Sequence, residues 1–121
     1  MNLFDSSALL SFLQGEQGAD VVERELDLGG VCSAANWSET AQKVLARGGD
    51  WSLARGLLLS YEVRVEPVLP ADAELAARLW RAGSGLSLAD RLCLATADRL
   101  HALVWTADTA WGRSDRVRQV R

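Results

Sequence analysis

Residues 1–13 read MNLFDSSALLSFL, and a change of pattern within this stretch is the clearest indication of the fold class. The apolar run over residues 1–4 predicts a short buried strand that ends at Asp5. Leu9, Leu10 and Leu13 then recur at helical spacing, which predicts a helix over residues 6–13. Asp5 therefore stands at the junction between a strand and a helix.

The same alternation of strand and helix patterns continues along the chain. Further strands are predicted over residues 31–34, 63–68, 103–106 and 117–120, and further helices over residues 18–28, 37–46, 70–82 and 88–101, with one more that ends at Tyr61. Strands that alternate with helices imply βαβ units. We therefore expect a three-layer α/β fold, in which a central, mainly parallel sheet of four to five strands is flanked by helices. The helix over residues 88–101 is apolar on nearly all faces, which predicts a central buried position.

The composition is that of a soluble globular protein. A length of 121 residues predicts a single domain over residues 1–121. The longest apolar run, residues 56–59, is far too short to span a membrane and predicts a buried helix segment. Trp80, among apolar neighbours in its predicted helix, is expected in the core. The N-terminus shows no basic region followed by an apolar stretch, so we expect no signal peptide, no membrane partner and a cytoplasmic location.

Charge and cysteine usage exclude some classes of function. The net charge of −3 argues against binding to nucleic acid through bulk electrostatics. The arginines that crowd the C-terminus form either a solvated basic tail or contacts with phosphate or acidic groups: Arg113, Arg116, Arg118 and Arg121. Cys32 and Cys93 form no CxxC pair and are expected to be buried free thiols, not a disulfide or a zinc site.

Four acids share one local setting, just after a predicted strand or at the start of a predicted helix: Asp5, Glu39, Asp90 and Asp108. In a parallel sheet these places meet at the carboxyl end of the strands, where such folds place their sites. Two unit charges about 4 Å apart repel by about 4 kcal/mol at an effective dielectric constant of about 20. A hard cation such as Mg²⁺ or Mn²⁺ prefers oxygen ligands and would offset this repulsion. The pattern therefore predicts a divalent metal site.

A purely structural interpretation of each acid stays open. Asp5 and Asp108 fit helix N-caps, and residues 36–39 and 87–90 both fit the capping-box pattern. Acids in the first turn of a helix also interact favourably with the helix dipole.

Taken together and in order, the motifs resemble those of the PIN-domain nucleases, and the small, single-domain form resembles the VapC toxins of toxin–antitoxin pairs. The resemblance covers essentially the whole chain and rests on residues 3–9 (LFDSSAL), 33–39 (SAANWSE), 86–90 (LSLAD), 95–97 (ATA) and 103–108 (LVWTAD). It implies that the catalytic, metal-binding residues are Asp5, Glu39, Asp90 and Asp108. It also implies supporting hydroxyl groups on Ser6, Ser7 and Thr106. Arg91 and Trp105 depart from the usual pattern of the family.

The resemblance further implies a Mg²⁺-dependent ribonuclease, in which Mn²⁺ can substitute and a metal-activated water hydrolyses the phosphodiester bond. No protein nucleophile is needed. The implied partners are an RNA substrate, a small VapB-like antitoxin that covers the active site, and a second copy in a homodimer or a higher toxin–antitoxin assembly. No motif identifies the RNA that is cleaved.

Two alternatives belong to other functional classes. One is a catalytically silent PIN-like binding module, which a metal-dependent cleavage assay would separate from a nuclease. The other is a phosphoacceptor receiver domain, which needs a lysine at the end of a late strand. The only lysine here is Lys43, within a predicted helix, so the sequence argues against the receiver.

Overall fold

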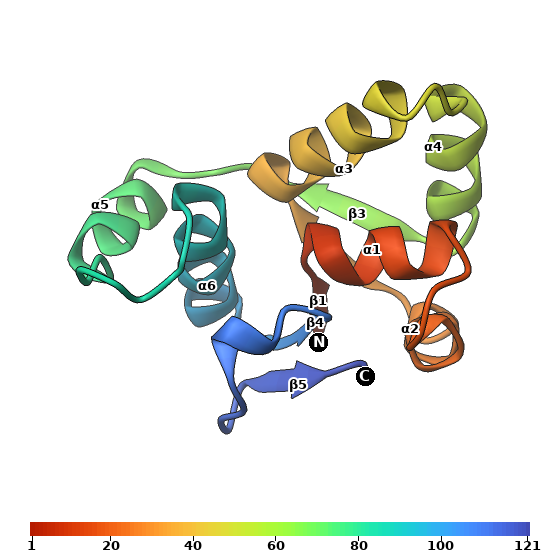
Figure 1. Cartoon of the computed structure of the whole chain (residues 1–121). Coiled ribbons are helices and arrows are strands. Elements are labelled where there is room, and N and C mark those ends of the chain that lie inside the picture. Colours follow the sequence, from red (N-terminus) through yellow and green to blue (C-terminus); the bar gives the residue numbers. More distant parts are fainter.

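Five parallel strands form the central sheet of the structure, a computed structural model that describes all 121 residues. The strands are β1 (Asn2–Phe4), β2 (Gly30–Ser33), β3 (Val63–Glu66), β4 (Leu103–Thr106) and β5 (Val117–Gln119). Their order across the sheet is β3-β2-β1-β4-β5 (Figure 1). The predicted fold class is confirmed, and every strand pair is parallel.

Helices cover both faces of this sheet, which gives three layers. They are α1 (Ser6–Leu13), α2 (Ala19–Leu26), α3 (Ala34–Ala46), α4 (Trp51–Ser60), α5 (Pro70–Arg78) and α6 (Leu88–Leu100), and a 3₁₀ turn, η1 (Thr109–Trp111), follows β4. Neighbouring strand residues point to opposite faces, so Phe4 joins a core with α1, α2 and α4, whereas Leu3 joins a core with α6. In Figure 1, α5 and α6 lie to the left of the strands, and α1, α2 and α4 lie to the right.

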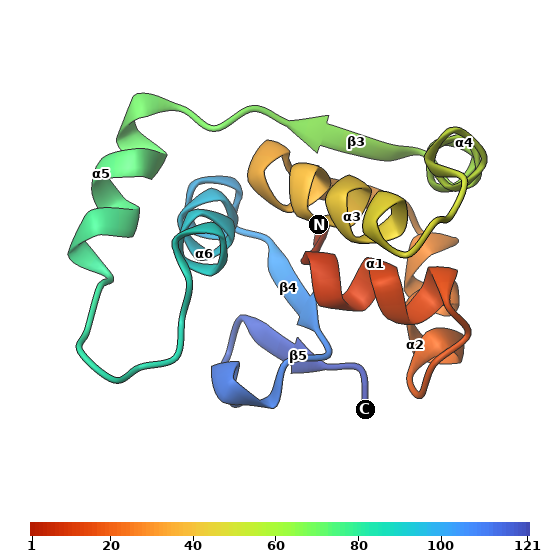
Figure 2. The same cartoon turned by 45° about the horizontal axis from the view of Figure 1, so that its top comes forward.

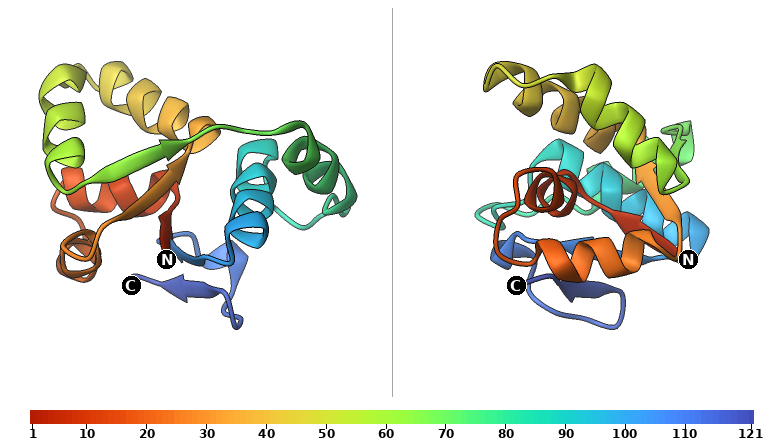
Figure 3. Two further views of the ribbon diagram at one scale, coloured as in Figure 1. Left: turned by 180° about the vertical axis from the view of Figure 1, so that it is seen from behind. Right: turned by 90° about the vertical axis from the view of Figure 1, so that its right-hand side faces the viewer.

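The path of the chain creates a switch point in the middle of the sheet. From β1 the chain moves outward through β2 to β3 and then returns to β4, which pairs with the other side of β1. On the way back, an extended segment leads from β3 to α5, which packs outside α6 (Figures 2 and 3). Ligand sites of open α/β sheets lie at such a switch point, beyond the carboxyl ends of the strands. Here that place is the edge where β1 and β4 end.

The start of α3 corrects one sequence prediction. The helix begins at Ala34 and not near Trp37, because Ser33 is its N-cap and accepts a hydrogen bond at Oγ from the Asn36 N–H (3.2 Å). The capping-box interpretation of residues 36–39 is therefore wrong. Glu39 lies one turn inside the helix, so a role as a capping residue does not explain its presence.

Burial corrects three further predictions. Trp80 is 59% exposed and not in the core, because α5 ends at Arg78 and leaves Trp80 in the following turn. Within α4, Leu58 is buried, but both of its leucine neighbours are largely exposed, since consecutive helical residues point in different directions. The helix α6 is amphipathic and not buried all round: Leu88 is 58% exposed, whereas Cys93 is fully buried.

The prediction for the two cysteines is confirmed. Cys32 and Cys93 are buried free cysteines, and burial raises the pKa of both thiols well above the usual value. None of the helices combines the length and apolar character that crossing a membrane requires.

Candidate active site at the carboxyl end of the sheet

Asp5 is the most deeply buried of the four acids, with 3% of its surface exposed. It follows β1 directly and is the N-cap of α1, where Oδ1 accepts a hydrogen bond from the Ala8 N–H (2.8 Å). Ser7 Oγ donates to the same oxygen (2.8 Å), and Thr106 Oγ1 donates to Oδ2 (2.5 Å). All the groups that hold this carboxylate are electrically neutral.

Ser7 and Thr106 also connect the two strand ends of the switch point. Ser7 Oγ accepts a hydrogen bond from the Ala107 N–H (2.9 Å), and Thr106 Oγ1 accepts one from the Asp108 N–H (3.0 Å). The β1–α1 junction is thus tied to the β4–η1 junction by two hydroxyl groups that both contact Asp5. The structure brings these two predicted supporting residues together around the first acid.

Glu39 approaches the same edge from α3. Its Oε1 accepts hydrogen bonds from Ser6 Oγ (3.1 Å) and from Asn36 Nδ2 (3.0 Å). Ser6 and Asn36 are both buried, whereas Glu39 is partly exposed. Its Oε2 accepts no hydrogen bond from the protein and stays free for a ligand.

Asp90 and Asp108 are held by main-chain groups of their own helix ends. Asp90 Oδ2 accepts a hydrogen bond from the Ser87 N–H (2.9 Å) while Ser87 Oγ accepts one from the Asp90 N–H (3.1 Å), which completes a capping box. Asp108 caps η1, where its Oδ1 accepts from the Ala110 N–H (2.9 Å). Both acids are partly exposed, and in each the second carboxylate oxygen has no partner in the protein.

Electrostatic repulsion links the four acids. Burial raises the pKa of Asp5 to about 6, against the opposing hydrogen bonds from Thr106, Ala8 and Ser7, and the negative charge of Asp90 adds to the increase. Burial also raises the pKa of Asp90, as do the charges of Glu39 and Asp108. No arginine or lysine forms a salt bridge with any of the four.

The four acids provide the kind of ligand that a hard divalent cation prefers. All their ligand atoms are carboxylate oxygens, three of the acids have an oxygen without a partner in the protein, and no basic side chain compensates their negative charge. The geometry is less complete, because no three His, Cys, Asp or Glu side chains lie close enough together to hold one ion. The caps of α6 and η1 set the orientation of Asp90 and Asp108. The structure thus gathers the acids at one edge without directing them to a single point.

The sequence profile described as PIN domain matches residues 3–117. The chain belongs to the PIN-domain family. No curated protein sequence matches it significantly.

Two solved structures show the same fold as this PIN domain. A toxin–antitoxin complex from Klebsiella pneumoniae contains a chain with 20% sequence identity and a TM-score of 0.77, and the match covers 100% of this chain and 98% of that one. VapC20 of Mycobacterium tuberculosis, described as a toxin that cleaves the sarcin-ricin loop, has 21% identity and a TM-score of 0.74. That match covers 95% of this chain and 98% of VapC20.

The sequence did not single out Asn36 as part of the site. Its place three residues before Glu39 suggested a helix cap, but its side chain contacts Glu39 from inside α3. The signal that could have found it is the serine at the end of the preceding strand, since Ser33 is an equally good N-cap, and a helix that begins after Ser33 has Asn36 in its first turn.

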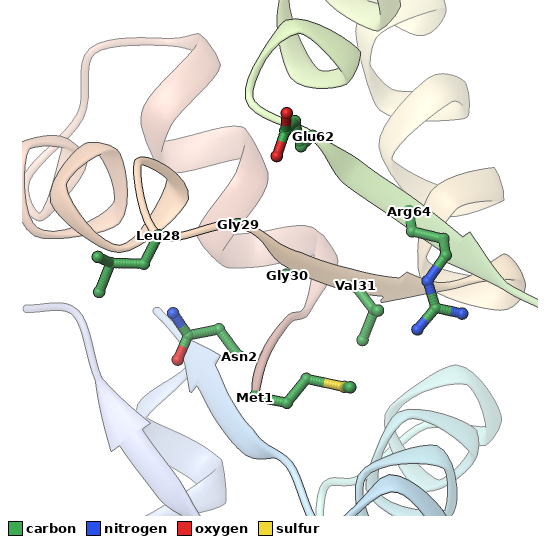
Figure 4. A pocket seen from close by; sticks show the side chains of 8 residues that line it. All are labelled: Met1, Asn2, Leu28, Gly29, Gly30, Val31, Glu62 and Arg64. Atoms are coloured by element: carbon green, nitrogen blue, oxygen red, sulfur yellow. The ribbon is translucent and has the colours of Figure 1, made fainter.

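The hollow shown in Figure 4 lies at the opposite, amino end of the sheet. Its volume is about 560 Å³, and its lining includes Met1, Leu28, Glu62 and Arg64. It contains none of the four acids or their hydroxyl partners. The acid-rich edge and this hollow are therefore separate features of the PIN domain.

Proposed function

We propose that this PIN domain is a divalent-metal-dependent endoribonuclease and the toxin of a VapBC-type toxin–antitoxin pair. The observation that carries the proposal is the set of four mutually repelling acids at the β1/β4 switch point, which has no cationic partner in the chain. The solved structures with the same fold support it, since one is a toxin–antitoxin complex and the other an RNA-cleaving toxin.

In this proposal, Asp5, Glu39, Asp90 and Asp108 hold Mg²⁺, for which Mn²⁺ can substitute. The bound cation supplies a lowered pKa for water and neutralisation of charge on phosphate oxygens, which together permit hydrolysis of a phosphodiester bond. Such a reaction needs no nucleophilic side chain.

The hydroxyl groups beside the acids have a supporting role. Ser7 Oγ donates to Asp5 and accepts from a main-chain N–H, and Ser6 Oγ donates to Glu39. Thr106 is fully buried and donates to Asp5 in the same way. These contacts orient the two carboxylates, and the hydrogen bonds from Thr106 and Ser7 act to lower the pKa of Asp5 against the effect of burial, because a hydrogen bond donated to a carboxylate stabilises its charge.

A catalytically silent PIN module is the second candidate. The observation that favours it is that Asp90 and Asp108 are held as helix caps and that no three acidic side chains lie close enough together to hold one ion. For catalysis, the acids must come closer together around a cation, which Asp90 and Asp108 can bind through the oxygen that takes no part in the cap. A cleavage assay distinguishes the two candidates.

The partners of the proposed toxin are RNA, a small antitoxin that covers the acid-rich edge, and a second copy of the chain in a homodimer or a larger toxin–antitoxin assembly. A nuclease of this kind needs restraint in its host. Co-expression with the neighbouring small open reading frame should therefore yield a tight complex with suppressed activity. If the wild-type protein can be expressed alone in large amounts without harm to the cells, the toxin assignment is contradicted.

The direct test is cleavage of RNA by the purified chain, with the new ends sequenced. We expect cleavage in Mg²⁺ or Mn²⁺ that leaves a 5′-phosphate and a 3′-hydroxyl, and no cleavage after chelation by EDTA. Activity that persists in EDTA would contradict metal dependence. A pure, folded protein that cleaves no RNA in Mn²⁺ would favour the silent module.

A further inference from the structure

Asn36 is a buried residue whose side-chain oxygen and nitrogen each form a hydrogen bond with another side chain. It is 1% exposed and lies in the first turn of α3. Its Oδ1 accepts a hydrogen bond from Ser33 Oγ (2.8 Å), and its Nδ2 donates to Glu39 Oε1 (3.0 Å). A continuous polar connection therefore runs from the end of β2 to the second proposed metal ligand.

The orientation of the Asn36 amide follows from the hydrogen bonds that Ser33 and Glu39 are able to form. Ser33 Oγ already accepts from the Asn36 N–H, so its single proton is available to donate to the amide oxygen. An ionised Glu39 can only accept hydrogen bonds. The Glu39 carboxylate therefore requires the NH₂ group of Asn36, which leaves the amide oxygen to accept from Ser33. In the reverse orientation two acceptor oxygens would face each other at Glu39, and that contact would be lost.

We propose that Asn36 is a positioning residue for Glu39. Oriented by Ser33, it donates to Oε1, and Ser6 donates to the same oxygen, so Oε2 stays free to bind a divalent cation. This inference rests on the proposed function, because it assigns to Asn36 an effect on the affinity of the metal site. Partners that orient metal ligands typically contribute a factor of about 10–100 to metal affinity.

A purely structural role for Asn36 makes a different prediction. A buried amide whose oxygen and nitrogen both have hydrogen-bond partners stabilises the fold wherever it lies, and its loss would lower stability without changing the affinity of the folded protein for metal. Thr40 provides a matched control. It is also fully buried on α3, and its Oγ1 donates to the Asn36 carbonyl oxygen (2.7 Å), but its side chain forms no hydrogen bond with the Glu39 carboxylate.

The experiment measures Mn²⁺ affinity by electron paramagnetic resonance of the free ion, at a temperature where circular dichroism shows every variant to be folded. Asn36→Leu and Thr40→Val each replace a buried polar side chain with an apolar one of similar size. We expect Asn36→Leu to weaken Mn²⁺ binding at least about tenfold and Thr40→Val to change it less than about twofold. If the leucine does not fit, Asn36→Ala removes the same donor without added volume.

A double-mutant comparison tests whether Asn36 acts through Glu39. In a Glu39→Gln background, removal of the Asn36 side chain should weaken Mn²⁺ binding by less than about twofold, since the carboxylate that it orients is gone. Equal Mn²⁺ affinity in wild type and both Asn36 variants would overturn the inference and leave the proposed nuclease intact. A wild type that binds no Mn²⁺ would overturn the metal centre itself, and the role of Asn36 with it.

Discussion

The buried acidic side chains of this PIN domain lie at two places, and different partners stabilise them. At the β1/β4 switch point, Asp5 is held by hydroxyl and main-chain N–H groups. At the far end of β3, Glu66 (7% exposed) and Asp72 (2% exposed) are bridged by Arg99 of α6. Arg99 Nε donates to Asp72 Oδ1 (2.9 Å) and Nη1 to Glu66 Oε1 (3.0 Å), and Arg64 also pairs with Glu66.

The pKa values of Asp5 and Asp72 shift in opposite directions although both side chains are buried. Burial raises the pKa of Asp5 to about 6. Burial also acts to raise the pKa of Asp72, but hydrogen bonds from Arg99 and from the Leu69 N–H outweigh it and lower the pKa. Acids neutralised by Arg99 attach α5 to α6, whereas acids without a counter-charge lie at the edge that we propose to bind a cation. Four measurements test this contrast.

The largest expected effect is on catalysis. Asp5→Asn and Asp90→Asn should each lower Mn²⁺-dependent RNA cleavage at least about a thousandfold, or about 4 kcal/mol in the activation barrier, because each removes a charged ligand. Asp50→Asn is the matched control, since Asp50 caps α4 through Leu53 and asparagine caps a helix equally well. Initial cleavage rates provide the measurement. More than a tenth of wild-type activity in either variant would exclude that acid as a principal ligand.

The next effect is on stability at the arginine-bridged acids. Arg99→Met should lower the free energy of unfolding by about 3 kcal/mol, because it leaves the buried carboxylate of Asp72 without a counter-charge. Arg24 pairs with Glu25 at 3.6 Å with a side chain that is 69% exposed, and Arg24→Met should change stability by less than about 0.5 kcal/mol. Urea unfolding at pH 7 compares the two, and equal effects would show that the bridge has no special structural role.

The third effect is a pH dependence of the metal-free protein. The folded-state pKa of Asp5, about 6, is above its unperturbed value of 3.8, so the folded state binds more protons between these values. Stability should therefore fall as pH rises from about 4 to about 6 and then level off, by at most about 3 kcal/mol from this group. Asp5→Asn keeps an N-cap but cannot ionise. The contribution of Asp5 is the difference between the unfolding free energies of the wild type and of this variant. If that difference does not change with pH, the prediction is contradicted.

The smallest effect concerns Asp90 in the metal-free protein. Its carboxylate both completes a capping box and repels Glu39 and Asp108, so the two contributions oppose each other on replacement. Asp90→Asn should change the metal-free unfolding free energy by less than about 1 kcal/mol. Excess Mn²⁺ should raise the melting temperature of the wild type by mass action and that of the variant much less. Equal increases in both proteins would show that Asp90 does not bind the ion.

The sequence predicted the β1–α1 junction almost to the residue, because the local pattern there is unambiguous. Helix α1 runs over the predicted residues 6–13, and Asp5 caps it. Prediction failed where a local pattern had two solutions. Ser33 and Asn36 are both good N-caps, and the choice of Ser33 depends on the end of β2, which the sheet determines.

The exposure of Trp80 could not be predicted for a related reason. A helix that continues to residue 82 would bury this side chain, whereas α5 stops at Arg78. The Arg99 bridge was also missed, since its partners lie 27 and 33 residues away and no sequence spacing pairs them.

The amino-acid sequence by itself determined the alternation of strands and helices and the supply of three acids at strand or helix ends, with a fourth, Glu39, inside α3. Both are local properties, set by side-chain periodicity and by residues within a turn of each other. Only the tertiary structure decided which strands are neighbours, and hence that Thr106 hydrogen-bonds to Asp5 from 101 residues away. It also decided which buried acids meet an arginine and which do not. These outcomes depend on long-range packing, because desolvation and charge pairing act between residues that only the fold brings together.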